Sequence, residues 1–220
     1  MKVKYYIIHN LNTSRKEKMD SLIEKYGIPE DDIKWIIHPN KNEITPEMRN
    51  KYVQQGITLT CGNLIGYLKD GYVCCSIKHY LALKDMVENE YEYAVVIEDG
   101  IGGFVNNVPE TLEKYVSQLP EDWDIVFDTN WCSYIEQPLQ EGKVVYKKSN
   151  EITNQCHGGS KLAQFYFLNL KCAKKMYENY IPFNNAPDWW MNDLFRKLDI
   201  NSYWAEPANC LLDMYKISST

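Results

Sequence analysis

The segment YAVVIEDG at residues 93–100 decides the fold of this chain. Its first five residues are apolar without a break, which is typical of a central strand that helices cover on both faces. Two acids, Glu98 and Asp99, follow the apolar run directly, and Gly100 ends the segment. Because ligands of open α/β sheets bind beyond the carboxyl ends of the strands, the segment also predicts where a functional site lies.

Strand and helix patterns alternate on both sides of this segment. Short β-rich runs predict further strands at residues 4–9, 33–37, 124–127, 164–168 and 202–204. Apolar residues at helical spacing predict helices at residues 14–26, 45–55, 76–88, 110–119, 171–180 and 188–198. Ser14 and Glu17 have the spacing of a capping box, which predicts that the first helix begins there. We therefore expect an α/β fold with a mainly parallel central sheet and helices on both faces.

Length and composition limit the class of protein. With 220 residues and 45% hydrophobic content the chain can bury a sizeable core, and we expect a single domain over residues 1–220. The formal net charge is −6 and no dense run of Lys or Arg occurs, so we expect no nucleic-acid partner. No apolar stretch approaches the roughly 20 residues of a membrane span, and residues 1–8 are too short and polar for a signal peptide. The expected location is the cytoplasm or another reducing intracellular compartment.

The cysteines indicate free thiols. Their number, seven, is odd, and no C-x-x-C pair occurs, unlike a disulfide framework or a zinc knuckle. A metal site made of Cys74, Cys75 and His79 is a poorer interpretation, because adjacent cysteine side chains on one element seldom converge on a tetrahedral ion. Residues 131–157 predict a loop with a small hairpin at Val144 and Tyr146.

The acids at the end of the central strand have two interpretations. Mg²⁺ and Mn²⁺ are held by one or two carboxylates together with substrate phosphates, so Glu98 and Asp99 are suited to such an ion. Alternatively, the two acids only cap a turn through Gly100. Asp128 ends another predicted strand and is a reserve candidate for a second acid, while His79 is expected to face inward and pack or hydrogen-bond beneath the site.

Asp188 is the candidate general base. It follows Pro187 and precedes two tryptophans, so a fixed helix start would hold the carboxylate while the indoles form the wall of a ligand pocket. The alternative is an ordinary helix N-cap with two core tryptophans.

Taken together and in order, these residues resemble glycosyltransferase family 25, which includes lipooligosaccharide galactosyltransferases and collagen-type hydroxylysine galactosyltransferases. The resemblance covers nearly the whole chain, and single motifs are loose. The matching residues are Ile8-His9-Asn10-Leu11 with Arg15, Cys74 to His79, the apolar strand with Glu98-Asp99-Gly100, Gly158-Gly159-Ser160, Ala173, Pro187-Asp188, Glu206-Pro207 and Ile217-Ser218-Ser219.

The resemblance implies a GT-A-like fold, a nucleotide-sugar donor that is usually UDP-linked, inversion at the anomeric carbon, and a glycan or hydroxylated protein as acceptor. It assigns donor binding to Asn10, Arg15, Lys78, Glu98 and Asp99. Glu98 and Asp99 would also hold Mn²⁺ or Mg²⁺, and the catalytic residue would be Asp188.

Three positions depart from the family pattern. Gly100 replaces the last acid of Glu-Asp-Asp, Cys74 replaces a Gly, and Lys78 replaces the Ser before His79. Lys78 either contacts the donor diphosphate or is a solvated lysine on a helix surface. Gly100 leaves a second function open, namely a nucleotide-sugar or glycan binding protein that retains the fold but is catalytically impaired.

Overall fold

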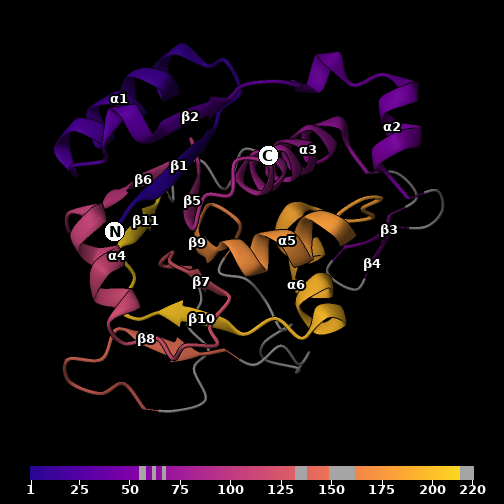
Figure 1. Cartoon of the computed structure of the whole chain (residues 1–220). Helices are drawn as coiled ribbons and strands as arrows, with labels where there is room; N and C mark the ends of the chain where they lie inside the picture. Colours follow the sequence, from indigo (N-terminus) through magenta and orange to yellow (C-terminus); the bar gives the residue numbers. More distant parts are fainter. Residues whose placement is uncertain (55–57, 61–62, 66–67, 132–137, 149–161, 214–220) are drawn as a thin grey trace.

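The computed structural model describes residues 1–54, 58–60, 63–65, 68–131, 138–148 and 162–213 (Figure 1). Within them, seven strands form one sheet in the order β2-β1-β5-β9-β7-β10-β8. The strands are β1 Val3–Ile8, β2 Ile33–Ile36, β5 Tyr93–Glu98, β7 Ile125–Phe127, β8 Val145–Lys147, β9 Phe165–Asn169 and β10 Ser202–Ala205.

Five of these strands run in the same direction. β1 pairs in parallel with β2 and β5, and β7 pairs in parallel with β10. β9 lies antiparallel between β5 and β7, and β8 lies antiparallel to β10 at the edge. The expectation of a mainly parallel sheet is confirmed, although the sequence did not predict the reversed direction of β9. Ile8 pairs with Glu98 in the register, so the ends of β1 and β5 are adjacent.

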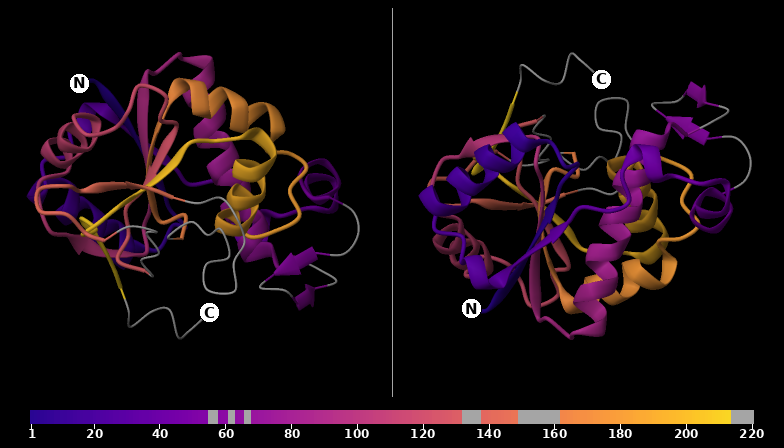
Figure 2. Two further views of the ribbon diagram at one scale, coloured as in Figure 1. Left: turned by 90° about the horizontal axis from the view of Figure 1, so that it is seen from below. Right: turned by 90° about the horizontal axis from the view of Figure 1, so that it is seen from above.

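Helices cover both faces of the sheet, as expected (Figure 2). α1 Thr13–Lys25 and α4 Val108–Val116 pack on one face. α3 Asp70–Glu88, α5 Leu170–Asn179 and α6 Pro187–Leu198 pack on the other. Val95 and Ile97 of β5 face the first layer, whereas Ala94 and Val96 face the second. Since side chains alternate along a strand, Glu98 points to the same face as Val96, toward α3.

The helix boundaries correct two expectations. α1 begins at Thr13, and its N-cap is Asn12, whose side chain accepts a hydrogen bond from the backbone of Arg15 at 3.1 Å. The predicted capping box at Ser14 is therefore wrong. α3 begins at Asp70 rather than near residue 76. The sequence pattern did not show the earlier start, because the first turn is largely exposed and has little apolar periodicity. α2 Pro46–Tyr52 follows its Thr45 N-cap as predicted.

Four short strands were not predicted. β3 Thr58–Thr60 and β4 Asn63–Ile65 form a hairpin beside α2 (Figure 1), and β6 Ile101–Phe104 pairs antiparallel with β11 Cys210–Leu212. β8 occupies part of the segment expected to form a hairpin, but it pairs with β10. Much of that segment lies outside the described residues.

At Gly102 the backbone of β11 lies close to β6. A Cβ atom there would lie 2.9 Å from the backbone oxygen of Leu212. We expect Gly102→Ala to lower the free energy of unfolding by about 1 to 3 kcal/mol, because the β11 backbone must move. Urea denaturation measures this, with Gly71→Ala as the control, since a Cβ at Gly71 meets nothing within 4 Å. An unchanged midpoint for Gly102→Ala would contradict the pairing.

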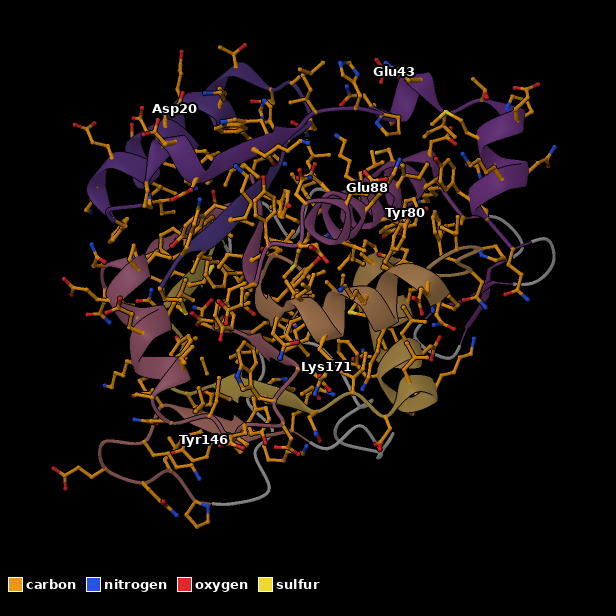
Figure 3. All side chains as sticks on the ribbon, in the orientation of Figure 1. Asp20, Glu43, Tyr80, Glu88, Tyr146 and Lys171 are labelled. Carbon is orange, nitrogen blue, oxygen red and sulfur yellow. The ribbon has the colours of Figure 1, made fainter. Side chains whose placement is uncertain are left out.

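Side-chain contacts join α3 to α5 and α5 to the sheet. Tyr80 of α3, labelled in Figure 3, stacks on Tyr177 of α5 with ring centroids 5.3 Å apart. Lys171 at the start of α5, labelled in Figure 3, forms an ion pair with the buried Asp124 carboxylate at 2.9 Å. Across the part of the chain that the structure describes, no helix has the length and apolar character needed to cross a membrane.

Candidate active site

Asp99 is the centre of a hydrogen-bonded network at the carboxyl ends of β1 and β5. Its Oδ2 lies 2.7 Å from Nδ1 of His9 and accepts the backbone N–H of Asn10 at 3.2 Å. Its Oδ1 accepts a hydrogen bond from the Arg15 guanidinium at 2.8 Å. The side chains of Asp99 and His9 are 6% and 5% exposed, and that of Arg15 is 29% exposed. The carboxylate therefore joins the turn between β1 and α1 to the end of β5.

The turn itself presents Asn10 at the surface. Oδ1 of Asn10 accepts the backbone N–H of Asn12 at 3.2 Å, and Leu11 between them has a φ of 62°. A branched residue in the left-handed region is uncommon, and such backbone strain concentrates at functional sites. The network around Asp99 and the Asn12 cap hold this turn in place.

Lys78 is buried beneath the same turn. Its Nζ donates to the backbone oxygen of His9 at 2.5 Å and to Oδ1 of Asn40 at 3.3 Å, and the residue is 2% exposed. The alternative of a solvated lysine on the surface of α3 is therefore wrong. Burial lowers the pKa of Lys78, and the charge of Asp99 acts in the opposite direction.

Glu98 belongs to a second cluster on the α3 side of the sheet. Its Oε1 lies 3.1 Å from Nε2 of His79 and 3.7 Å from Sγ of Cys75. The other ring nitrogen of His79, Nδ1, lies 2.9 Å from the hydroxyl of Tyr166 on β9. His79 is fully buried and Glu98 is 22% exposed, so the predicted inward position of His79 is confirmed.

Asp188 lies in the first turn of α6 and is partly exposed. Burial of the carboxyl group raises the pKa of Asp188 from 3.8 to about 6, and the negative charge of Glu98 acts in the same direction. The backbone N–H of Trp189 acts in the opposite direction. The charge of His79 lowers this pKa. Asp188 therefore lies near enough to Glu98 and His79 for their charges to act on its carboxyl group. The neighbouring Trp190 donates its indole N–H to the backbone oxygen of Tyr180 at 2.7 Å.

The predicted residues thus form two adjoining groups. Around the end of β1 lie Asn10, Arg15, Lys78 and Asp99, whereas Glu98 and Asp188 lie with His79 on the α3 face of the sheet. Asp128, the reserve acid, accepts from the Tyr115 hydroxyl at 2.8 Å and from the backbone of Asn209 at 2.6 Å. That carboxylate joins β7 to the segment before β11. Gly158-Gly159-Ser160 and Ile217-Ser218-Ser219 lie outside the described residues.

Sequence reasoning gave no site role to His9 and Tyr166, and it considered Cys75 only in the poorer metal interpretation with Cys74 and His79. Cys75 carried a usable signal, because it precedes His79 by four residues and thus shares a helix face with it. His9 directly follows β1, but the contact with Asp99 depends on strand order. Tyr166 could not be found, because β9 enters the sheet antiparallel.

The arrangement of the two acids does not fit an all-oxygen site for Mn²⁺ or Mg²⁺. Both oxygens of Asp99 accept hydrogen bonds from protein donors, and Glu98 faces a sulfur and a nitrogen. Gly100 supplies no third carboxylate. Hard cations prefer oxygen ligands that converge on one point, so we derive no step through such an ion. The requirement for Mn²⁺ or Mg²⁺ stays a prediction.

Comparison with known families identifies the chain. Residues 2–191 match glycosyltransferase family 25, described as LPS biosynthesis protein. The chain belongs to glycosyltransferase family 25. Membership makes this family 25 protein a transferase of sugars, which implies a nucleotide-sugar donor and an acceptor. No match is found among curated proteins.

Several solved structures are similar to this family 25 chain over most of its length. A glycosyltransferase involved in glycosylation of the major capsid of PBCV-1 is 10% identical, with a TM-score of 0.48 and coverage of 96% of this chain and 92% of that one. A putative glucose-1-phosphate thymidylyltransferase from Bacillus anthracis, in complex with a sucrose, is 12% identical, with a TM-score of 0.41 and coverage of 92% and 87%. Mouse xyloside xylosyltransferase 1 is 13% identical, with a TM-score of 0.35 and coverage of 89% and 68%. The assignment rests on the family match.

Proposed function

We propose that this chain transfers a sugar from a UDP-linked donor to a hydroxyl group of a glycan or a hydroxylated protein, with inversion at the anomeric carbon. The observation that supports this most is the match of residues 2–191 to glycosyltransferase family 25. Within this chain, burial raises the pKa of Asp188, in the first turn of α6, to about 6. A carboxylate whose pKa lies near neutrality is a better general base than an ordinary one.

The donor would bind across the ends of β1 and β5. Arg15 extends from the first turn of α1 with part of its guanidinium exposed, and Lys78 adds a second positive charge below the turn. These cations would stabilise the charge that grows on the diphosphate as the bond to the sugar breaks. Asn10, which is exposed in the same turn, would contact the nucleotide, and Glu98 would face the sugar side.

The transfer step follows from inversion. The acceptor oxygen attacks the anomeric carbon while Asp188 removes the hydroxyl proton, and UDP leaves with the electron pair of the broken carbon–oxygen bond. Asp188 is suited to this role because the backbone of a helix start fixes it and it remains partly exposed.

The test is UDP release from a set of UDP-sugars with simple glycan acceptors, with and without Mn²⁺. We expect acceptor-dependent UDP release with at least one donor. Absence of release with every donor and acceptor, under both metal conditions, would reject the proposed transfer.

A second function is favoured by Gly100, which stands where the family motif has its last acid. In that case the chain binds a nucleotide sugar or a glycan without transferring it. Calorimetry separates the two functions, since a binding protein gives a saturable heat with UDP-sugar and no turnover on any acceptor.

The activity should depend on pH through Asp188. A general base acts in its ionised form, and the pKa of Asp188 is raised to about 6. We therefore expect kcat/KM to rise with pH and to level off above that value, so that it is about tenfold lower at pH 5 than at its plateau. A pH–rate profile with acceptor below its KM and saturating donor measures this. A flat profile between pH 5 and 7 would contradict the assignment of Asp188.

A further inference from the structure

We propose that Cys75, His79 and Glu98 form a binding site for a borderline-soft divalent cation of the zinc class. The three side chains each offer one ligand atom, and these atoms lie within 4.8 Å of one another. The inference does not rest on the proposed function, because binding of the ion needs neither donor nor acceptor.

Two of the distances between the ligand atoms are close to those around a tetrahedral ion, and all three atoms lie within 4.8 Å of one another. Zinc binds sulfur at about 2.3 Å and nitrogen or oxygen at about 2.0 to 2.2 Å, which places neighbouring ligand atoms about 3.3 to 3.6 Å apart. In this structure Oε1 of Glu98 lies 3.7 Å from Sγ of Cys75 and 3.1 Å from Nε2 of His79. Small side-chain movements would therefore complete the coordination of all three.

The backbone places the three ligands rigidly. Cys75 and His79 are four residues apart on α3, so they project from the same face one turn apart. Glu98 is the last residue of β5 and points toward that face. An ion would thus join the middle of α3 to the rim of the sheet, and the partly exposed Cys75 and Glu98 give it a route from solvent.

The surroundings of His79 are those of a metal ligand. Metal-bound histidines almost always hydrogen-bond through their second nitrogen, which fixes the tautomer and the ring orientation. Here Nδ1 of His79 faces the Tyr166 hydroxyl at 2.9 Å. A hydroxyl group can donate or accept, so Tyr166 satisfies Nδ1 both when Nε2 carries a proton and when Nε2 binds an ion.

A second buried hydroxyl supports a ligand at this place. Tyr180 is fully buried, and its hydroxyl has no hydrogen-bond partner among the residues that the structure describes. Cys75, Glu98 and Asp188 all act electrostatically on this phenol, so it faces the same cluster. A zinc ion with three protein ligands takes a fourth ligand that is water or another group. The Tyr180 hydroxyl, which has no hydrogen-bond partner among the described residues, and Asp188, whose charge acts on it, are polar groups that could face that ligand.

The proposed site differs from the metal site of Cys74, Cys75 and His79 that the sequence suggested. Sγ of Cys74 contacts the backbone oxygen of Gly71 at 3.2 Å and is not part of the cluster. Glu98, distant in sequence, takes the place that the adjacent cysteine would have filled. The pair Cys74 and Cys75 therefore offers matched variants for a test.

The experiment uses the whole chain, reduced and freed of metal with a chelator. Co²⁺ is added first, because a thiolate ligand gives an intense near-ultraviolet band, and Zn²⁺ is then used to displace it. We expect a single site per chain, a thiolate-to-cobalt band, and an increase in Tm with Zn²⁺. Cys75→Ser should abolish the band and weaken Zn²⁺ binding on the order of 100-fold or more. Cys74→Ser should keep the cobalt band and the wild-type affinity for Zn²⁺. Tyr166→Phe should weaken binding about tenfold.

Two further variants keep the proposal falsifiable if Cys75→Ser folds poorly. Glu98→Gln should keep the cobalt band, since the thiolate remains, but lose affinity, and Cys75→Ala should lose the band. Thermal unfolding without metal verifies that each variant is folded. The proposal is overturned if the wild-type chain gives no thiolate band, or if Cys74→Ser loses the band while Cys75→Ser keeps it.

Discussion

We expect Asp188→Asn to lower kcat about 10² to 10⁴-fold, with little change in the KM for the donor. The reason is that the amide cannot accept the proton of the acceptor hydroxyl, while its shape and its place in the first turn of α6 are kept. Initial rates of UDP release at saturating donor and acceptor measure the effect. The remaining rate should also lose the rise with pH that the wild-type enzyme shows near 6.

Stability separates a catalytic role of Asp188 from a structural one. The pKa of this carboxyl is raised in the folded state from 3.8 to about 6, so the folded chain binds the proton more tightly than the unfolded chain. The contribution to stability is then lost as pH rises through that range. At pH 7.5 the ionised carboxylate of Asp188 destabilises the folded chain, so Asp188→Asn should leave Tm unchanged or raise it.

Asp193→Asn is the matched control for this prediction. Asp193 lies on the same helix and pairs with Arg196 near the surface. We expect this variant to retain wild-type kcat. Equal losses of kcat in Asp188→Asn and Asp193→Asn, or a fall in Tm that accompanies the loss at Asp188, would show that the helix rather than the carboxylate is responsible.

The unbroken apolar run along β5 explains why part of the site could be predicted from sequence. An unbroken apolar run predicts a central strand, and acids that follow it must lie at the rim where ligands bind. Helical spacing likewise placed His79 inward. These inferences need only local periodicity, and the structure confirms the buried strand and the buried histidine.

Other parts of the site depend on which strands are neighbours, and periodicity does not contain that information. Nothing in the residues around His9 indicates that β1 lies beside β5, which is what places its ring on Asp99. A lysine in a helix is usually solvated, yet Lys78 is buried because the β1 turn passes over α3 and offers the oxygen of His9. Tyr166 reaches His79 only because β9 enters the sheet antiparallel to β5.

Asp99→Ala is expected to lower the free energy of unfolding by about 3 kcal/mol, because it removes the acceptor of a buried hydrogen-bonded pair. His9 would lose its partner at a position only 5% exposed, and the backbone N–H of Asn10 would lose its acceptor as well. Arg15→Ala should cost less, about 1 kcal/mol, since its side chain is 29% exposed and water can replace part of the contact. Urea denaturation of the metal-free chain measures both.

The metal-free condition distinguishes the network from a pure metal-ligand role for Asp99. If Asp99 acted only on an ion, its removal would leave the stability of the metal-free chain unchanged or would increase it, because like charges would no longer be held together. If the carboxylate instead holds the β1 turn, Asp99→Ala and Arg15→Ala should be strongly non-additive, since each removes the same hydrogen bond. Asp20→Asn on α1, an exposed acid that pairs with Lys16, provides the control and should change stability by no more than about 0.5 kcal/mol.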